Sequence, residues 1–262
     1  MGIAESNMMG FAAGLSTCGT PVFASTFAVF AAGRAFDQVR NSIAYANCNV
    51  KIGATHGGVM IGADGGSHQC IEDLALMRAI PGMCVLCPAD AKETFACVEA
   101  ALKHYGPVYL RFGRFETPDL YTENDCAFTI GKGTVLRDGT DTAIIATGEM
   151  VYQALLAGQE LQNRGVSAAV IDMASIKPID DELIIKYAEK IGYLVTIEDH
   201  NVLGGLGGAV AETLVKSCPV RMDRLGVQDC FGRSGEPLEL AEAYGLNCET
   251  IVRTVLRQLK GE

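Results

Sequence analysis

Two series of short apolar segments, each alternating with longer segments of helical periodicity, constrain the fold of this chain more than any other feature. The first series fills the N-terminal half and the second the C-terminal half. Short strands joined by helical crossovers pair in parallel, and the helices then cover both faces of the sheet. The segments that we interpret as strands are 20–26, 48–55, 83–88 and 106–113, and then 142–147, 166–173, 192–199 and 219–227.

The intervening segments carry apolar residues at helical spacing. One begins at Asp90, with Glu93 in the capping-box position three residues later, and this pattern predicts a helix start. The predicted helices are 27–45, 67–80, 90–106, 150–165, 178–191, 206–218, 236–245 and 248–260.

Between the two series, from about residue 115 to 140, the alternation lapses into a turn-rich, partly polar stretch. Such a stretch suits a connection between domains. The predicted fold class is therefore α/β, with two consecutive three-layer α/β domains, each a mainly parallel sheet with helices on both faces. The predicted boundaries are 1–120 for the first domain, 121–140 for the linker and 141–262 for the second domain.

Charge and hydropathy exclude several classes of function. The net charge is −10, whereas a nucleic-acid-binding protein needs a basic footprint. The sequence contains no run of about 18 apolar residues that would predict a membrane span. It also shows no signal-peptide pattern at its start, so the expected location is the cytoplasm.

The ten cysteines are scattered, and Cys84 and Cys87 form a Cys-x-x-Cys pattern inside a predicted strand. Residues three apart in a strand point to opposite faces, so these two thiols could not hold one ion together. We therefore expect reduced core thiols, not disulfides or a metal site.

The densest cluster of polar residues and glycines lies at residues 55–74, "THGGVMIGADGGSHQCIEDL", and contains His56, Asp64 and His68. A glycine-rich loop lets the backbone approach a ligand closely. The spacing of the histidines and the aspartate also permits a metal site, although no third close ligand supports one. A tight loop with two hydrogen-bonded histidines is the other interpretation of this stretch.

Glu5 is the single acid in the apolar, small-residue segment 1–16. One interpretation is an acid at a helix start, stabilised by the local dipole. The other is a functional carboxylate in an apolar site, where burial would raise its proton affinity.

Several longer motifs together resemble transketolases. The segments "GIAESNMMGFAAGLS", "FASTFAVFAAGRAFDQVRNSIAY" and "GATHGGVMIGADGGSHQCIEDLALMRAIPGM" are similar to the transketolase pyrimidine-binding domain. The segments "IDMASIKPID" and "VTIEDHNVLGGLGGAVAE" look like the transketolase C-terminal domain. Because the resemblance spans nearly the whole chain, the protein looks like the second chain of a two-chain transketolase. The family's pyrimidine-binding domain carries further residues before "GIAES", so the chain looks shortened at its N-terminus.

The resemblance implies that thiamine diphosphate is the coenzyme and assigns catalytic roles to Glu5 and His68. The Glu5 carboxyl would share a proton with a nitrogen of the pyrimidine ring. Phe27 and Phe30 would pack against that ring and exclude water. Two core phenylalanines would be the ordinary interpretation of the same residues. Where family members have a further aromatic residue, this chain has "AAG", so the stacking contact is expected to be thinner.

For the sugar substrate, the resemblance places His56 and Arg114 near the phosphate, with Arg111 as the alternative to Arg114. An arginine can clamp phosphate through two parallel hydrogen bonds. Asp64 and His68 would bind sugar hydroxyls near the reacting carbons. The glycines after His200 could cradle phosphate, but they fit close helix–sheet packing or an interface better.

The diphosphate end of the coenzyme needs ligands that this sequence does not offer. Thiamine enzymes hold magnesium through Gly-Asp-Gly followed at a distance by Asn. Here "ADGG" at 63–66 imitates the start, but no asparagine occurs between Asn49 and Asn124. The resemblance therefore implies that an N-terminal transketolase subunit supplies the Mg²⁺ or Ca²⁺ and diphosphate site, in an expected α2β2 assembly.

The expected reaction is transfer of a two-carbon ketol unit from a ketose phosphate to an aldose phosphate. Deoxyxylulose-phosphate synthases and the β-subunits of 2-oxoacid dehydrogenases have a similar domain order and remain alternatives. A non-catalytic scaffolding subunit is the alternative from another class.

Overall fold

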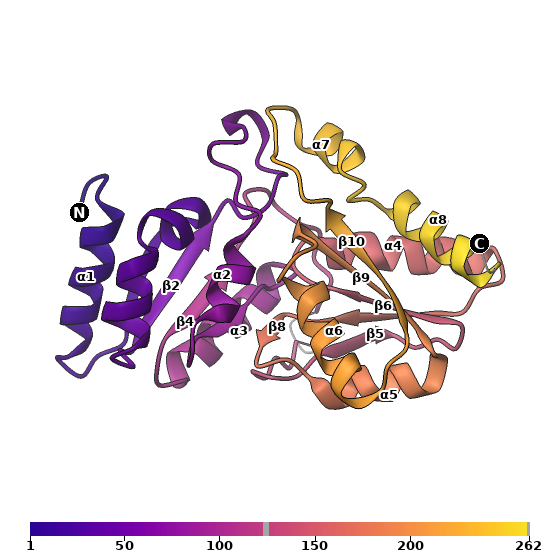
Figure 1. The fold of residues 1–262 in the computed structure, drawn as a ribbon, viewed down its shortest axis with the longest axis horizontal. Helices are drawn as coiled ribbons and strands as arrows, with labels where there is room; N and C mark the ends of the chain where they lie inside the picture. Colours follow the sequence, from indigo (N-terminus) through magenta and orange to yellow (C-terminus); the bar gives the residue numbers. More distant parts are fainter. Residues whose placement is uncertain (123–125, 261–262) are drawn as a thin grey trace.

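Two five-stranded sheets, lying side by side, organise the chain in a computed structural model that describes residues 1–122 and 126–260 (Figure 1). Neighbouring strands pair in parallel in both sheets except for one antiparallel edge strand in each. This confirms the predicted fold class. The first sheet has the order β1 (Val22–Phe27), β2 (Val50–Thr55), β4 (Val108–Arg111), β3 (Cys84–Leu86) and β8 (Ser175–Lys177); the second has the order β10 (Arg221–Val227), β9 (Tyr193–Asn201), β6 (Thr142–Ala146), β7 (Ala168–Asp172) and β5 (Thr134–Arg137).

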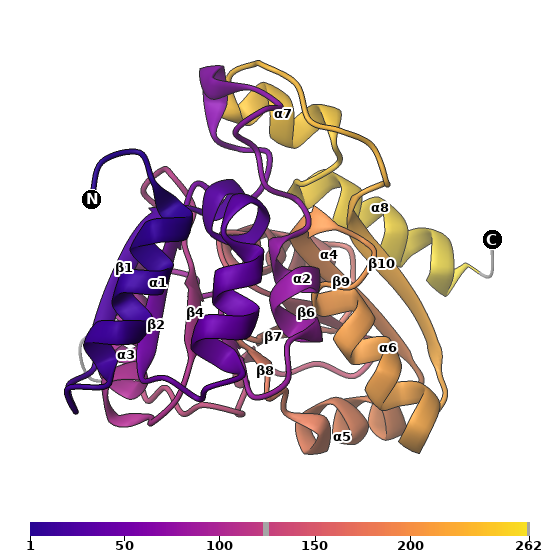
Figure 2. The same cartoon turned by 60° about the vertical axis from the view of Figure 1, so that its left-hand side comes forward.

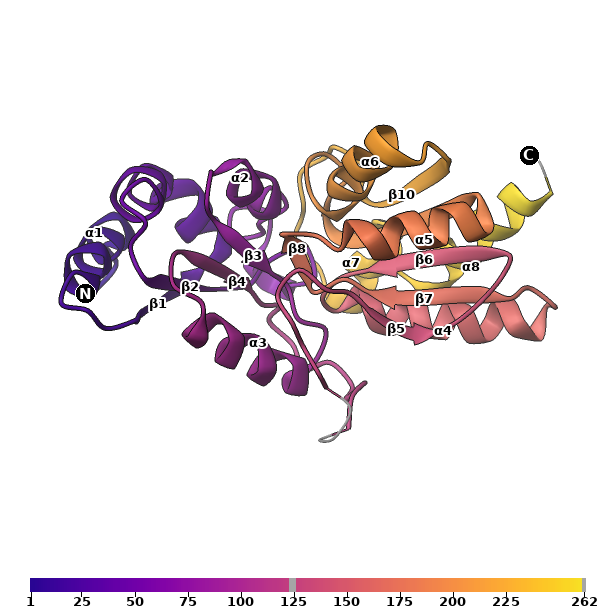
Figure 3. The same ribbon diagram turned by 90° about the horizontal axis from the view of Figure 1, so that it is seen from below.

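Helices cover both faces of the first sheet (Figure 3). One face carries α1 (Glu5–Ser16), α2 (Asp73–Ala79) and the π-helical turns η1 (Val29–Arg34) and η2 (Gln38–Ala44). The other face carries α3 (Ala91–Lys103). Two separate apolar clusters, one on each side of the sheet, follow from this arrangement.

The second sheet is built in the same way. On one face lie α4 (Met150–Asn163), α7 (Pro237–Ala243) and α8 (Cys248–Leu259), and on the other lie α5 (Asp181–Ile191) and α6 (Leu206–Ser217). The strands β6 and β7 are buried along their whole length, which is why they appear in the sequence as continuous apolar runs without alternation.

The structure divides the chain less simply than the predicted boundaries do. Residues 134–137, inside the predicted linker, form β5 and pair with β7. Residues 175–177, inside the predicted second domain, form β8 and pair with β3 of the first sheet. Lys177 also donates to the carbonyls of Arg78 and Ile80 at 2.7 and 2.6 Å, at the end of α2. The two domains are therefore interlocked, and we keep the terms first and second domain for the parts built on each sheet.

The local sequence pattern predicted the start of α3 correctly, but it predicted the structure of residues 27–45 only in part. The Asp90 carboxylate accepts from the Glu93 N–H at 2.8 Å, which confirms the predicted cap. The predicted helix 27–45 forms two π-helical stretches instead. At the end of the first, the Ala35 N–H donates to the Phe30 carbonyl, five residues back, at 3.0 Å. The wider π turn rotates the side chains away from ordinary helical positions.

All ten cysteines lie in the described part of the chain and are free. Cys84 and Cys87 belong to the clusters on opposite sides of the first sheet, as predicted. Cys18 and Cys230 are exposed, so these two are not the expected core thiols. Within 1–122 and 126–260, no helix has the length and apolar character needed to cross a membrane.

Candidate functional site

Four aromatic rings gather where the first two strands of the first sheet end. Phe27 is the last residue of β1, His56 follows β2, and Phe30 and His68 come from η1 and from the glycine-rich loop. The Phe27 ring stacks on His56 at 3.7 Å and on Phe30 at 5.8 Å between centroids, and His68 meets Phe30 edge-on at 5.6 Å. All four rings are only partly buried. Because ligands of parallel sheets bind at the carboxyl ends of strands, this aromatic cluster marks a candidate site.

Glu5 begins α1 and is joined to the aromatic cluster through Arg34. The Arg34 guanidinium donates to the Glu5 carboxylate at 2.9 Å and lies over the Phe30 ring at 4.5 Å. Arg34 occupies the end of η1, directly after the "AAG" segment. A cation–π contact therefore covers the Phe30 face.

The structure corrects the expected proton affinity of Glu5. A hydrogen bond from its own backbone, and then the Arg34 guanidinium, hold the pKa of the Glu5 carboxyl below its usual value, although burial acts in the opposite direction. The side chain is only 7% exposed, but its neighbours stabilise the charge more than burial penalises it. In this chain Glu5 is therefore an ionised hydrogen-bond acceptor.

His56 adopts a left-handed backbone conformation with φ of 60°. Its Nδ1 lies 2.9 Å from the Thr55 hydroxyl. Burial, followed by the charge of Arg114, lowers the pKa of His56. The ring is therefore neutral at neutral pH, which suits stacking on Phe27 and hydrogen bonding to a substrate.

Arg114 and Asp64 form an ion pair at the outer side of the glycine-rich loop, and both side chains are 36% exposed. Arg114 also donates to the Ile61 carbonyl at 2.6 Å. Arg111 lies in a different setting. It is 3% exposed, and its guanidinium contacts the Asp73 carboxylate at 3.2 Å and the Asp199 carbonyl at 2.6 Å. These partners hold Arg111 at the domain junction, and the preference for Arg114 over Arg111 as the phosphate ligand stays a prediction.

The glycine-rich loop leans against the second domain (Figures 1 and 2). A Cβ at Gly65 would lie 2.4 Å from the Ser234 hydroxyl, and a Cβ at Gly66 would lie 2.7 Å from the Gly232 carbonyl. Gly65 also has φ of 72°. These glycines are needed because the loop approaches another segment closely and turns through a left-handed conformation.

The glycines after His200 serve packing, as the sequence analysis favoured. The Glu198 carboxylate accepts from the N–H groups of Leu206 and Gly207 at 2.6 and 2.8 Å, at the start of α6. A Cβ at Gly205 would lie 1.9 Å from that carboxylate. A negatively charged side chain therefore occupies the place where a phosphate would have to bind.

The residues present fit one end of thiamine diphosphate. Partly buried aromatic faces and an ionised carboxylate acceptor suit a flat, nitrogen-containing ring. No group of three His, Cys, Asp or Glu side chains placed to hold a metal ion occurs in 1–122 and 126–260. The described residues thus fit the pyrimidine end of the coenzyme.

Sequence reasoning missed two residues of this region. Arg34 follows Phe30 by four positions in the predicted helix, so the spacing could have suggested their contact. Asp199 reaches the glycine-rich loop from the second domain, 140 positions away from Val59 along the chain, and no local signal indicates such a contact.

Comparison with known proteins agrees with this geometry. Residues 1–119 match the family described as transketolase, pyrimidine binding domain, and residues 131–251 match transketolase, C-terminal domain. A putative transketolase C-terminal section of Methanocaldococcus jannaschii is 48% identical, over 100% of this chain and 82% of that protein. A 6-deoxy-6-sulfo-D-fructose transketolase subunit of Clostridium sp. (strain MSTE9) is 45% identical, over 97% of this chain and 78% of that protein.

A solved structure, described as a split gene transketolase in an inactive β4 tetramer, superposes with a TM-score of 0.93 at 51% identity. The match covers 99% of this chain and 83% of that one. The resemblance inferred from the sequence motifs is thereby confirmed. This chain belongs to the transketolase family, as a C-terminal subunit of the split, two-chain kind.

Proposed function

We propose that this chain, together with an N-terminal transketolase subunit, transfers a two-carbon ketol unit from a ketose phosphate to an aldose phosphate. The observation that carries the proposal is the continuous set of contacts from Glu5 through Arg34 to Phe30, Phe27 and His56. This set offers a carboxylate and aromatic faces to one ring, at the carboxyl ends of two parallel strands.

Thiamine diphosphate, when bound, supplies the carbon nucleophile and the electron sink for breaking the carbon–carbon bond. Glu5 would accept a hydrogen bond from the pyrimidine ring nitrogen when that nitrogen is protonated, and would share this proton with it. Phe27 and Phe30 orient the ring and exclude water from it. A backbone hydrogen bond, and then the Arg34 guanidinium, hold the pKa of the Glu5 carboxyl below its usual value.

On the substrate side, the neutral His56 ring and His68 hydrogen-bond the sugar, with His68 near the reacting carbons. Asp64 accepts from a sugar hydroxyl, and such contacts reject substrates that lack the hydroxyl. Arg114 is half-exposed and therefore accessible to the phosphate. On binding the substrate phosphate, Arg114 would donate to the phosphate oxygens and give up part of its hydrogen bonding to Asp64, because the phosphate carries the larger negative charge.

The partner subunit holds the diphosphate and its Mg²⁺ or Ca²⁺, since the described part of this chain has no cluster of metal-binding side chains. An α2β2 assembly would place each site between chains. The exposed apolar side chains near α1 and β1 suit burial against another subunit; they are Ile3, Phe11, Leu15 and Phe23. A cytoplasmic location and a place in the pentose phosphate pathway are parts of the same proposal.

The test is reconstitution of the purified subunit with its N-terminal partner, thiamine diphosphate, Mg²⁺ and a panel of donors. Ketol transfer from a ketose phosphate only when both chains are present supports the proposal. Decarboxylation of pyruvate would favour the deoxyxylulose-phosphate synthase or 2-oxoacid dehydrogenase alternatives. Ketol transfer by the complex that Glu5→Gln leaves unchanged would indicate a non-catalytic scaffolding subunit, and full turnover by the partner alone would also contradict the proposal.

A further inference from the structure

Asp199 of the second domain reaches into the glycine-rich loop of the first. Its carboxylate accepts from the Val59 N–H at 2.9 and 3.1 Å and from the Met60 N–H at 3.3 Å. The side chain is 1% exposed. Buried backbone N–H groups without an acceptor are costly, so the position of the loop depends on this carboxylate.

The approach is possible because the loop has a glycine facing the carboxylate. A Cβ at Gly58, where φ is 86°, would lie 1.9 Å from Asp199 Oδ2. The Gly58 N–H in turn donates to the Cys70 carbonyl at 2.7 Å. The start and end of the loop are therefore held together at the place where Asp199 enters.

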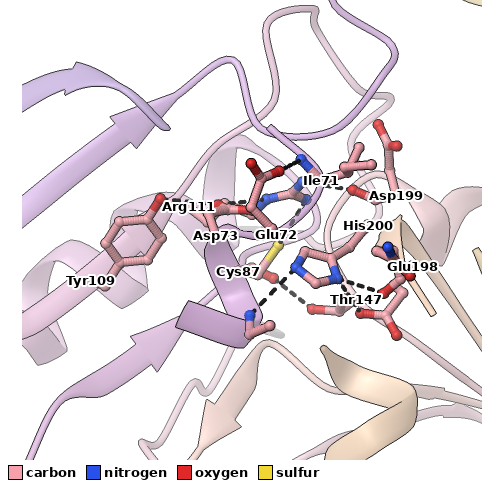
Figure 4. A network of polar contacts seen from close by, with 12 residues as sticks. Ile71, Glu72, Asp73, Cys87, Tyr109, Arg111, Thr147, Glu198, Asp199 and His200 are labelled. Atoms are coloured by element: carbon pink, nitrogen blue, oxygen red, sulfur yellow. Dashed lines mark hydrogen bonds and ion pairs between the residues drawn. The ribbon is translucent and has the colours of Figure 1, made fainter. Parts of the chain in front are cut away.

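Asp199 is itself held rigidly (Figure 4). The Arg111 guanidinium donates to its backbone carbonyl at 2.6 Å, and Arg111 is fixed in turn by Asp73. Burial, and then the neighbouring charge of Asp199, raise the pKa of the Glu149 carboxyl, so Glu149 is neutral and adds no second negative charge. The carboxylate thus acts from a fixed point at the end of β9.

The loop needs such an anchor because of its own composition. Gly57 and Gly58 directly follow His56, and two glycines allow many backbone conformations. The Gly57 N–H bond to the Phe112 carbonyl, at 3.1 Å, and the Asp199 bonds at Val59 and Met60 remove that freedom. His56, which stacks on Phe27, lies immediately before the anchored segment, and Asp64 and His68 follow Met60 by four and eight positions.

We infer that Asp199 is a positioning residue for the sugar-phosphate side of the site. The second domain, which contributes none of the proposed coenzyme contacts, thereby sets the geometry of His56, Asp64 and His68. This inference rests on the proposed function for its kinetic consequence, but the anchoring of the loop is testable without activity.

The test compares Asp199→Asn with Asp180→Asn in the full-length chain. Asn has the same shape, but in either orientation its NH2 group would face another donor, the N–H of Val59 or that of Met60. Asp180 is a matched control: it is 5% exposed, lies in the second domain and accepts from the N–H groups of Gly133 and Leu183 at 3.1 and 3.2 Å. A general loss of stability would appear in both variants.

Hydrogen exchange followed by mass spectrometry reads the anchoring directly. In Asp199→Asn we expect amide exchange in residues 57–66 to accelerate by about tenfold or more, with wild-type rates at these residues in Asp180→Asn. Wild-type exchange of this loop in Asp199→Asn would overturn the inference. The result is informative even if the wild-type complex proves to transfer no ketol unit.

In the reconstituted two-chain enzyme, Asp199→Asn should raise KM for the ketose phosphate by about tenfold and leave the affinity for thiamine diphosphate within about threefold. A merely structural role would weaken both affinities together or neither. Equal effects on KM in Asp199→Asn and Asp180→Asn would therefore also contradict the inference. Absence of ketol transfer in the wild-type complex would count against the proposed function and not against the anchor.

Discussion

The outer flank of the first domain and the junction between the domains contrast sharply. We define the outer flank by Glu5, Arg34, Phe27 and Phe30, and the junction by Arg111, Asp73 and Asp199. The flank side chains other than Glu5 are partly exposed, with Arg34 at 51%. The junction residues are at most 3% exposed and are linked by hydrogen bonds and an ion pair.

The contrast separates two tasks within one chain. Groups at the junction have partners within the chain, so they fix the relative position of elements from both domains. Groups on the flank offer ring faces and a charged acceptor that are only partly used, so they are available to a ligand or to another subunit. Mutations of the Arg111–Asp73 pair at the junction should act mainly on stability, and mutations on the flank should act mainly on turnover.

The largest effect is expected at the junction, from Arg111→Met. Removing Arg111 leaves the Asp73 carboxylate buried without a counter-charge, with only the Tyr109 hydroxyl still donating to it, and breaking a buried ion pair in this way costs about 3–5 kcal/mol. Equilibrium unfolding of the chain in urea measures the loss. Arg164→Met is the control, since Arg164 pairs with Glu160 on the exposed surface of α4 and should contribute about 1 kcal/mol or less. Similar losses in the two variants would remove the distinction between junction and surface.

On the flank, Glu5→Gln should lower kcat of the reconstituted enzyme by about 10²-fold or more, because a group that exchanges a proton with the coenzyme is lost. The fold should be retained, since the amide keeps the shape of the side chain and a hydrogen bond to Arg34. The exposed Glu99→Gln on α3 is the control and should retain wild-type turnover. Unchanged turnover in Glu5→Gln would assign the flank a structural role only.

The smallest expected effect is a change in how the stability of the chain depends on pH. Glu93, which contacts the Ala89 N–H at 2.7 Å, is buried near Asp172. Burial, and then the charge of Asp172, raise the pKa of Glu93. The folded state therefore binds a proton that the unfolded state releases, and stability falls as pH rises from the unfolded pKa through the folded one.

Glu93→Gln should reduce this alkaline loss between pH 6 and 9, since the amide does not titrate. Urea unfolding at the two pH values measures it, with Glu99→Gln expected to follow the wild-type dependence. An unchanged pH dependence in Glu93→Gln would mean that the buried carboxyl is not the titrating group.

The same contrast explains what sequence could predict. The alternation of strands and helices and the Asp90–Glu93 cap are local patterns, and both appear in the structure as expected. Close helix–sheet packing at the glycines after His200 was also recognised. Each of these features depends on residues near one another in the chain.

Contacts between residues that lie far apart in the sequence could not be predicted from local sequence patterns. β8 has three residues and exists because β3 of the other domain offers an edge. The pKa of Glu5 is lowered by its own backbone hydrogen bond and then by Arg34, which lies 29 positions away in the sequence. The roles of Glu5, Phe27, Phe30, His56, Asp64, His68 and Arg114 stay predictions that rest on the family, although the structure brings the aromatic members together.

The central claim is that this chain binds the ring end of thiamine diphosphate while a partner subunit holds the diphosphate. Near-ultraviolet circular dichroism of the bound coenzyme tests it most directly, with the partner alone, with wild-type chain added and with Glu5→Gln added. We expect a coenzyme signal that requires both chains and is lost in Glu5→Gln. The same signal from the partner alone, or one that Glu5→Gln leaves unchanged, would contradict the account.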